Sequence, residues 1–436
     1  MWFSICNSSV IPVGWSESSY QVKTLLLPSI VKKITMKKLI TNSNPFTTDH
    51  TMPTPNLSSP TLIPEQPKKI FYIDNLKVGL ITLVILHHAL NTYGAEGGWY
   101  YWQKTTNTGV SMTMVLLITI NQSFFMGFFF FLSAYFIPAS YNKKGAVRFV
   151  KDRLLRLGIP LVFYSFVLSP VLIYMVYYFG QGHHITFIQF LSGFHDWIDF
   201  GVLWFVAALL LFTAVYVLWR IVSQKYKSKS LAAPSSRMIL GFAAGVGMIS
   251  FLVRIVFPIG WILKPVGFNL AYFSQYVALF IVGLAAAKNK WLDTLRYNYG
   301  KRFMRYALRL LLFFLAMGII QKLTRAPQDW FTGGLHWQQL LYAIWEQLLG
   351  FSIIVALLTF GKKFWNRSTA LMAKLSRNAF AVYIFHPLVL LAISLSIRNL
   401  AIDPAWKFLI VAPLAVSGSF LLASVITLIP GVRKII

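Results

Sequence analysis

The sequence predicts an all-α fold, a polytopic integral membrane bundle of about ten transmembrane helices. Of the 436 residues, 57% are hydrophobic and only 12% are charged, whereas charged residues make up about 25% of a typical soluble domain. The apolar residues fall into long runs separated by short polar connections. A run of about 20 apolar residues is long enough to cross a bilayer as a helix. Composition and patterning together exclude a soluble globular domain.

The first predicted span contains Asn75 to Tyr93, and nine further apolar runs follow it. We expect these near residues 111–138, 157–179, 202–221, 238–256, 267–287, 303–320, 337–360, 376–397 and 406–429. The three weakest runs carry arginine: Arg254 in the fifth, Arg305 and Arg309 in the seventh, and Arg377 in the ninth.

The charges in the connections predict an orientation. The formal net charge is +28, but the basic residues lie between apolar runs, so they indicate topology rather than nucleic-acid binding. The second, fourth, sixth and eighth connections each carry five or six Lys and Arg residues, and the others carry two at most. Because basic connections stay in the cytoplasm, the pattern predicts an even number of spans with both termini cytoplasmic.

The chain divides into an N-terminal leader and a membrane domain. Residues 41–66 are rich in Pro, Ser and Thr, a composition typical of disorder, and we predict a disordered leader over residues 1–66. Met36 could be the true start, which would leave residues 1–35 untranslated. Residues 67–436 form one predicted membrane domain. The single cysteine, Cys6, excludes an internal disulfide framework and a cysteine-based metal site.

The first span carries a polar stripe. At about 100° per residue, Lys77 and His88 lie within roughly 20° of the same face and about 16 Å apart along the axis, and Asp74 and Thr92 lie close to that line. His87 points about 80° away from it. An ionisable group at membrane depth usually has a function, although a neutral histidine can also join two helices by a hydrogen bond. A functional role is favoured for His88, and a helix-packing role is favoured for His87.

Two arginines, Arg153 and Arg156, lie three residues apart where the third span begins. On one helical face their planar guanidinium groups could hold a polyphosphate, such as the nucleotide end of coenzyme A. Alternatively, they are topology signals whose side chains extend to lipid head groups, and spacing alone favours this second interpretation.

Other motifs have two interpretations each. The third connection contains His and Asp residues without helical HxxxH spacing, so we expect a solvated loop rather than a metal site. The first connection, GGWYYWQ, and Trp204 are typical of an aromatic belt at the membrane interface, but aromatic rings also stack on sugars. His386, followed by Pro387, lies beside a predicted helix kink or start, and either packing or a function could explain it.

Taken in order, these motifs resemble the acyltransferase-3 family of bacterial membrane acyltransferases, which includes O-antigen acetylases and glucan biosynthesis protein C. The resemblance covers the chain from about Phe71 to Ile436. It rests on the Lys77 to His88 spacing, where the family more often has Arg, on FFMGFFFFLSAYFI with Ala134 in place of Gly, and on RLLR at Arg153 and Arg156. The stretches LWFVAALL and FAVYIFHPLVL match later signatures.

The resemblance implies a membrane-bound O-acyltransferase in the bacterial cytoplasmic (inner) membrane. Cytoplasmic acetyl-CoA or succinyl-CoA would donate the acyl group to a hydroxyl of an extracytoplasmic or lipid-linked carbohydrate. Its partners would be lipid, acyl-CoA and carbohydrate, with no nucleic acid, no metal and no bound cofactor. The residues expected at the site are His88 and Lys77 (catalytic), Arg153 and Arg156 (acyl-CoA binding), and Asp74, Glu96, Trp204 and His386 (supporting). The alternative is a transporter or a substrate-binding membrane protein that uses the same polar stripe.

Overall fold

The computed structural model describes residues 70–223 and 230–436. The predicted leader over residues 1–66 lies outside the described residues. Within the described part, ten helical segments are long and apolar enough to cross a membrane, and they coincide with the ten predicted runs. No strand occurs there, and Leu263 and Phe268 form an isolated β-bridge. The prediction of an all-α membrane bundle of about ten spans is therefore confirmed.

The helices of the first five spans and their connections are α1 (Phe71–Tyr93), α2 (Thr108–Gln122), α3 (Phe125–Lys144), α4 (Ala146–Arg153), α5 (Ile159–Phe163), α6 (Ser169–Met175), α7 (Phe187–Ser192), α8 (Trp204–Val222) and α9 (Ser236–Val256). The remaining helices are α10 (Phe273–Lys288), α11 (Tyr297–Thr324), α12 (Asp329–Thr332), α13 (Trp337–Phe364), α14 (Ala370–Ser396), α15 (Pro404–Ile426) and α16 (Val432–Ile435).

Two spans are less regular than the sequence predicts. The second span is broken at Ser123 and Phe124, which separate α2 from α3. The third span starts at Ala146, earlier than expected. It alternates α-helix with π-helical turns at Leu154–Gly158, Tyr164–Leu168 and Val176–Gly180. Its start was placed too late because the charged residues of α4 lack apolar character, although they continue the same helix.

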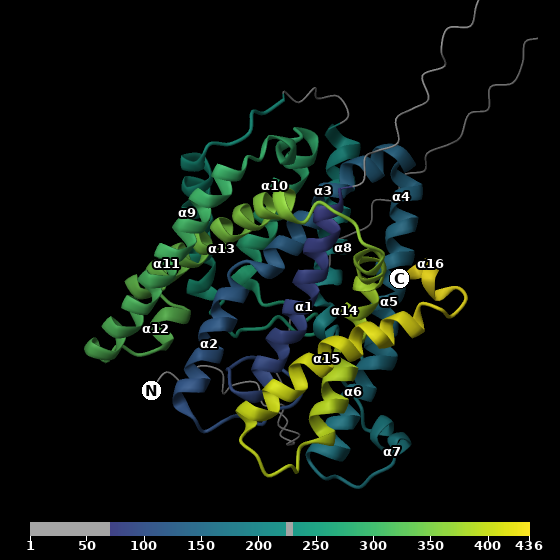
Figure 1. Ribbon diagram of the computed structural model, residues 1–436. Helices are drawn as coiled ribbons and strands as arrows, with labels where there is room; N and C mark the ends of the chain where they lie inside the picture. The colour runs from purple at the N-terminus through teal and green to yellow at the C-terminus, as the bar shows by residue number, and fades with distance from the viewer. Residues whose placement is uncertain (1–69, 224–229) are drawn as a thin grey trace, which may run out of the picture. The chain divides into compact units, whose positions relative to one another are not determined.

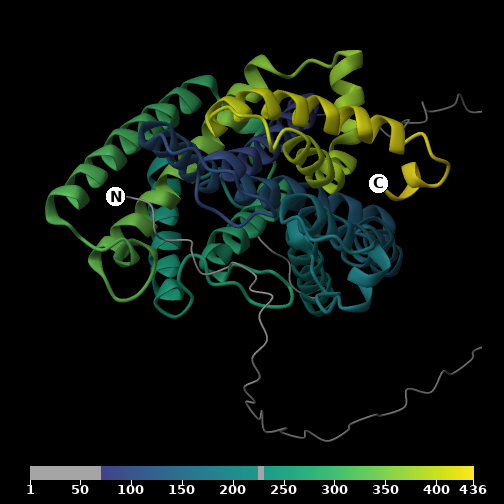
Figure 2. The same cartoon turned by 90° about the horizontal axis from the view of Figure 1, so that it is seen from below.

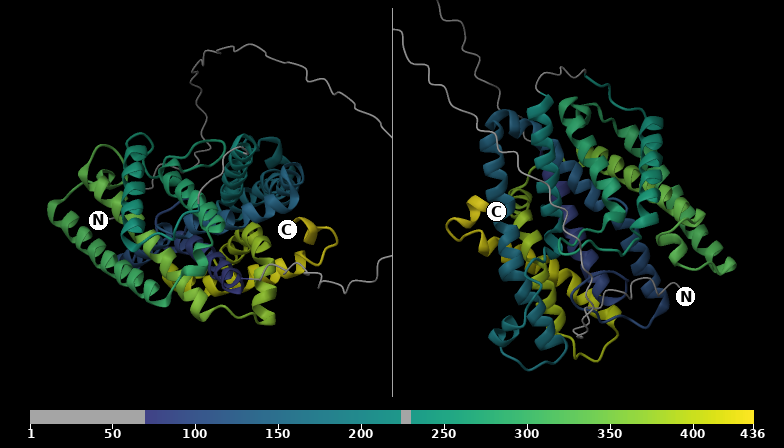
Figure 3. Two further views of the ribbon diagram at one scale, coloured as in Figure 1. Left: turned by 90° about the horizontal axis from the view of Figure 1, so that it is seen from above. Right: turned by 180° about the vertical axis from the view of Figure 1, so that it is seen from behind.

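Helix α1 lies in the middle of the bundle. It packs against α13, α14 and α15, and also contacts α2 and α3. Figure 1 shows α9, α11 and α13 on one side of α1 and α15 on the other, and the view from below in Figure 2 agrees. Figure 3 shows the same grouping from above and from behind. Because α1 is surrounded, three of its polar side chains, His87, Asn91 and Thr92, are buried within the bundle.

The arginine that interrupts the fifth run is buried in an ion pair. Arg254, at the end of α9, is 0% exposed, and its Nη2 donates to Glu346 Oε2 of α13 at 2.6 Å. Its Nε donates to the carbonyl of Ala271 at 3.1 Å. A buried charge is tolerated in an apolar environment only when it is paired, so this pair explains why an arginine-containing run can still form a span.

Candidate active site

His87 and His88 lie on α1 in different surroundings. The His87 ring stacks on Phe125 of α3, with centroids 5.0 Å apart, and its Nδ1 lies 3.2 Å from Nδ2 of Asn121. Because an amide nitrogen can only donate, Nδ1 of His87 accepts and the hydrogen of the neutral ring is on Nε2. These contacts join α1 to the break between α2 and α3. They fit the packing interpretation of His87.

His88 belongs to a stack of three nearly parallel rings. Its centroid lies 4.0 Å from the ring of Trp99, with an interplanar angle of 18°, and 5.4 Å from the ring of His386, with an angle of 15°. The Nδ1 atom of His88 is buried and has no hydrogen-bond partner. An unpaired buried nitrogen is costly, so His88 has a ring atom available for a substrate.

Helix α14 fixes the orientation of His386. Pro387 lies inside this helix and has no backbone N–H, so the carbonyl four residues earlier, that of Tyr383, lacks its helical partner. Nδ1 of His386 lies 2.8 Å from this carbonyl oxygen. A carbonyl can only accept, so Nδ1 carries the hydrogen and Nε2 of the neutral ring is an acceptor. Nε2 is buried without a partner, which leaves a second unused imidazole nitrogen beside His88.

The loop between α1 and α2 holds Trp99 against His88. The backbone N–H groups of Gln103 and Thr105 donate to the last residues of α1 at 2.8 and 3.0 Å. The Thr105 hydroxyl donates to Asp403 at 2.7 Å, and Lys407 of α15 donates to Gln103 Oε1 at 3.1 Å. The loop is therefore fastened both to α1 and to the start of α15. Trp99 is buried, 8% exposed, and covers His88.

Three tyrosines near the ring stack form hydrogen bonds through their hydroxyls. The hydroxyls of Tyr100 and Tyr164 lie 2.8 Å apart, and the Tyr383 hydroxyl donates to the carbonyl of Val202. Burial raises the pKa of Tyr100 well above its usual range, so its phenol stays neutral at physiological pH. The hydrogen bond from Tyr383 joins α14, which carries His386, to the residues just before α8.

The other predicted site residues on α1 and in its loop lie apart from the ring stack. Lys77 Nζ is 3.4 Å from Asp74 Oδ1 and 4.8 Å from the ring centroid of Phe136. It sits about 16 Å along the helix axis from His88. Glu96 is partly buried in the loop that carries Trp99. Lys77 and His88 therefore occupy opposite halves of α1.

Trp204 begins α8 and packs with other aromatic residues. Its ring centroid lies 5.5 Å from that of Tyr276 on α10 and 6.5 Å from that of Phe130 on α3. These contacts place Trp204 inside the bundle, half-buried, where the second, fourth and sixth spans (α3, α8 and α10) meet. It does not contact the rings of His88 or His386 in the stack described above.

The two arginines of the predicted nucleotide site point into different surroundings. Arg153 lies over Phe149, 5.1 Å from the ring centroid, and its Nε is buried without a partner. The side chain of Arg156 is 61% exposed and its Nε lies 3.4 Å from Asp152. The reason is the π-helical turn that begins at Leu154: i→i+5 hydrogen bonds widen the turn, so residues three apart are no longer α-helical neighbours.

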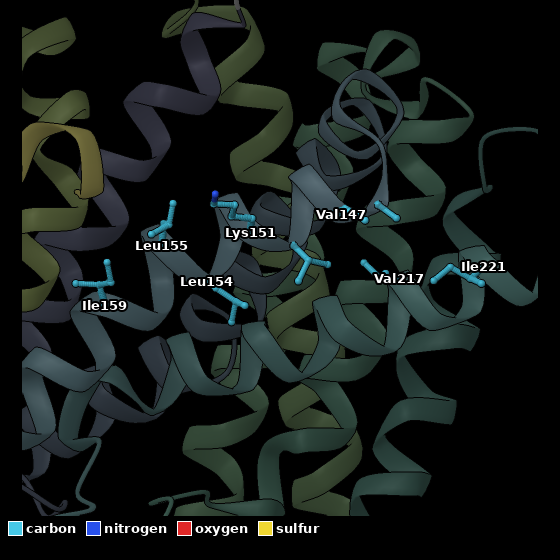
Figure 4. Close-up of a pocket in the computed structure, with 9 residues that line it drawn as sticks. Val147, Lys151, Leu154, Leu155, Ile159, Val217 and Ile221 are labelled. Atoms are coloured by element: carbon cyan, nitrogen blue, oxygen red, sulfur yellow. The ribbon is translucent and has the colours of Figure 1, made fainter. Parts of the chain in front are cut away.

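A groove of about 680 Å³ lies beside these arginines, between the start of the third span and α8. Figure 4 shows Leu154, Leu155 and Ile159 on one wall and Val217 and Ile221 on the other, with Lys151 at the edge. Neither arginine lines it. Because its walls are hydrocarbon, the groove suits a lipid chain rather than a phosphate. Among the described residues, no group of His, Cys, Asp and Glu could hold a metal ion.

Sequence reasoning missed two partners of the histidines. Trp99 was assigned to an interfacial belt because nothing in the sequence shows that its loop folds back onto α1. Asn121 carries a weak signal, since Asn121, Gln122 and Ser123 form a polar triplet inside an otherwise apolar run. Such a triplet at membrane depth needs internal hydrogen-bond partners, and that signal could have indicated a break.

The family is shown by comparison with protein-family models. The model described as an acyltransferase domain, acyltransferase 3, matches residues 70–424, which is most of the chain. No curated protein and no solved structure matches the chain significantly. The match covers all ten membrane-spanning segments almost completely, so it concerns the whole bundle rather than a single motif. The chain is a multi-pass membrane protein that belongs to the acyltransferase-3 family.

Proposed function

We propose that this protein is a membrane O-acyltransferase of the bacterial cytoplasmic membrane. It transfers an acetyl or succinyl group from cytoplasmic acyl-CoA to a hydroxyl of an extracytoplasmic or lipid-linked carbohydrate. The observation that carries the proposal is the stack of His88 and His386, which brings two unpartnered imidazole nitrogens together inside an acyltransferase domain. Neutral imidazole is suited to take a proton near pH 7.

The transfer is an exchange of acyl partners. The hydroxyl oxygen of the acceptor attacks the thioester carbonyl carbon, a C–O bond forms, and the C–S bond breaks. His88 takes the hydroxyl proton as general base and returns it to the leaving thiolate, which departs as free CoA thiol. His386 has its hydrogen held on Nδ1 by the Tyr383 carbonyl, and it keeps the ring of His88 in its stacked position. If His88 itself accepts the acyl group first, an acid-quenched turnover contains acylated His88, which mass spectrometry detects.

The donor site lies at the opposite end of the bundle in this proposal. Arg153 and Arg156 hold the phosphates of CoA, and its pantetheine arm extends into the bundle toward His88. Two observations support this: Arg153 has a buried, unpartnered Nε, and Arg156 is largely exposed. Lys77, with Asp74 beside it, lies in the half of α1 away from His88. In this proposal it adds a positive charge on the path of the pantetheine arm.

Reversing the charge at Arg153 tests the donor site. We expect Arg153→Glu to raise the KM for acyl-CoA about tenfold or more, since a charge-assisted hydrogen bond to phosphate is lost, and to leave the KM for the acceptor nearly unchanged. Steady-state kinetics with each substrate varied in turn measure both constants. Arg148→Glu, an exposed arginine of the same connection, is the matched control. No change in the donor KM would return Arg153 to the role of a topology signal.

Removing the cover over His88 should uncouple the reaction. We expect Trp99→Ala to lower acyl transfer and to raise CoA release without transfer, because water that the indole excludes can then reach the thioester. Trp99→Phe keeps an aromatic ring and should retain most of the coupling. The ratio of free CoA to acylated acceptor measures the effect. An unchanged ratio in Trp99→Ala would contradict the covering role of this residue.

The substrates follow from two further measurements. Purified protein in vesicles is given isotope-labelled acetyl-CoA or succinyl-CoA with carbohydrate acceptors, and covalently labelled acceptor supports the enzyme. Movement of the acceptor across the vesicle without modification would support a transporter instead. Mass spectrometry of cell-surface glycans with and without the gene identifies the acyl group and the acceptor.

A further inference from the structure

A chain of buried hydrogen bonds connects the Arg254–Glu346 ion pair to the break beside His87. We propose that Gln275 of α10 is a positioning residue of the transfer reaction, because it holds the break between α2 and α3 at the place where Asn121 fixes the ring of His87. This inference rests on the proposed function, and it concerns residues outside the predicted site.

The chain has four hydrogen bonds, three between side chains and one to a backbone carbonyl. Arg254 donates to Glu346 Oε2 at 2.6 Å, and Gln347 Nε2 donates to the same oxygen at 3.1 Å. Gln275 Nε2 donates to Gln347 Oε1 at 2.8 Å and to the carbonyl of Ser123 at 2.7 Å. All five residues are buried. In an apolar interior such a network is rigid only when its members are paired, so Gln275 is the link between the ion pair and the break.

The packing around Gln275 leaves no room for a different arrangement. A Cβ atom at Gly350 of α13 would lie 1.9 Å from the carbonyl oxygen of Ser123, and a Cβ at Gly127 of α3 would lie 2.7 Å from Gln275 Oε1. Both glycines therefore allow the backbone of the break and the amide of Gln275 to approach closely. Small residues serve the same purpose at membrane helix interfaces in general.

The position of the break between α2 and α3 affects the position of the histidine rings. Asn121 is the second-last residue of α2, two residues before Ser123, and its carbonyl accepts the backbone N–H groups of Ser123 and Phe124. The Asn121 amide donates to Nδ1 of His87, whose ring meets that of His88 edge-on, with centroids 5.6 Å apart. A shift of the break would move Asn121, then the His87 ring, and with it one neighbour of His88. Gln275 donates to Ser123 and Gln347 rather than to either histidine, so in this proposal it acts through Asn121.

A double-mutant cycle tests this route. Methionine is close to glutamine in size, so Gln275→Met removes both donated hydrogen bonds with little change in volume. We expect it to lower kcat about tenfold, less than the ~100-fold that a 1 Å misplacement can cost, with the donor KM unchanged. Asn121→Ala should lower kcat similarly. If Gln275 acts through Asn121, the double variant is no slower than Asn121→Ala alone. Losses that multiply would overturn the proposal.

Two readouts separate a positioning role from a general loss of structure. Gln321→Met is the matched control, because Gln321 is also a buried span residue but donates only to a nearby loop carbonyl; its kcat should stay near that of the wild type. Diethylpyrocarbonate labelling, resolved by mass spectrometry, should increase at His87 in Gln275→Met and stay unchanged in Gln321→Met. Unchanged labelling of His87 would overturn the proposal. If the wild type acylates no acceptor, the proposed function fails, and the labelling still tests the route from Gln275 to His87.

Discussion

His88→Ala should abolish acyl transfer while the protein still inserts into the membrane and elutes as a single species. Loss of a general base typically lowers a rate by about 10²–10⁴-fold, and His88 has an unpartnered ring nitrogen among the stacked rings. His88→Asn removes the same base with a smaller change in volume and should be equally inactive. Labelled acyl-CoA and purified protein measure both rates. Activity near the wild-type level in either variant would remove His88 from the mechanism.

The adjacent histidine is the matched control for this experiment. Nδ1 of His87 already accepts a hydrogen bond from Asn121, and its ring is stacked on Phe125, so its role is to support its neighbour. We expect His87→Ala to lose about tenfold in kcat, far less than His88→Ala. An equal loss in the two variants would show that the helix geometry selected the wrong histidine.

Glu346→Ala should be among the most destabilising single substitutions in the bundle. It leaves the guanidinium of Arg254 buried and unpaired, which costs about 3–5 kcal/mol. The double variant Arg254→Met with Glu346→Leu removes both charges and should recover most of that stability. Thermal unfolding in detergent, followed by size-exclusion chromatography, ranks the variants.

The matched control is a partly exposed ion pair. Asp152 lies 2.7 Å from Lys144, but both side chains are 30% exposed, and such pairs contribute about 0–1 kcal/mol. Asp152→Ala should therefore unfold near the wild-type temperature. A Glu346→Ala variant as stable as Asp152→Ala would show that Arg254 finds another partner or reaches water.

The spans were predictable because bilayer thickness imposes one length on every crossing helix, and the chain has to satisfy it with apolar residues. Asn75–Tyr93 was recognised for that reason. The structure places the rings of His87 and His88 against different neighbours, Phe125 and Trp99, and the choice between the two histidines stays a prediction. The roles of His88 and Lys77 stay predictions, as do those of Arg153 and Arg156. The family could be inferred from the order of motifs along the chain, because a single sequence shows that order completely.

The remaining features depend on contacts that no local pattern encodes. Arg254 made the fifth run a weak candidate for a span, because its partner, Glu346, lies in another span and the run itself does not show the pairing. The π-helical turn after Arg153 cannot be deduced from RLLR, which is equally compatible with an α-helix. Trp99 lies against His88 in a loop that is held partly by Thr105, which bonds to Asp403 near the other end of the sequence. For Arg254 and Trp99 the decisive neighbour is distant along the chain.

The break between α2 and α3 also constrains the order in which the protein is assembled. Its carbonyl at Ser123 is bonded by Gln275, which is 152 residues later in the sequence. At about 5–20 residues per second of synthesis, the ribosome needs roughly 8–30 s to reach that partner. During this interval the Ser123 carbonyl lacks its permanent donor. A chain that stops before α10 therefore lacks the residue that completes its second span, so biogenesis of this bundle cannot proceed one finished helix at a time.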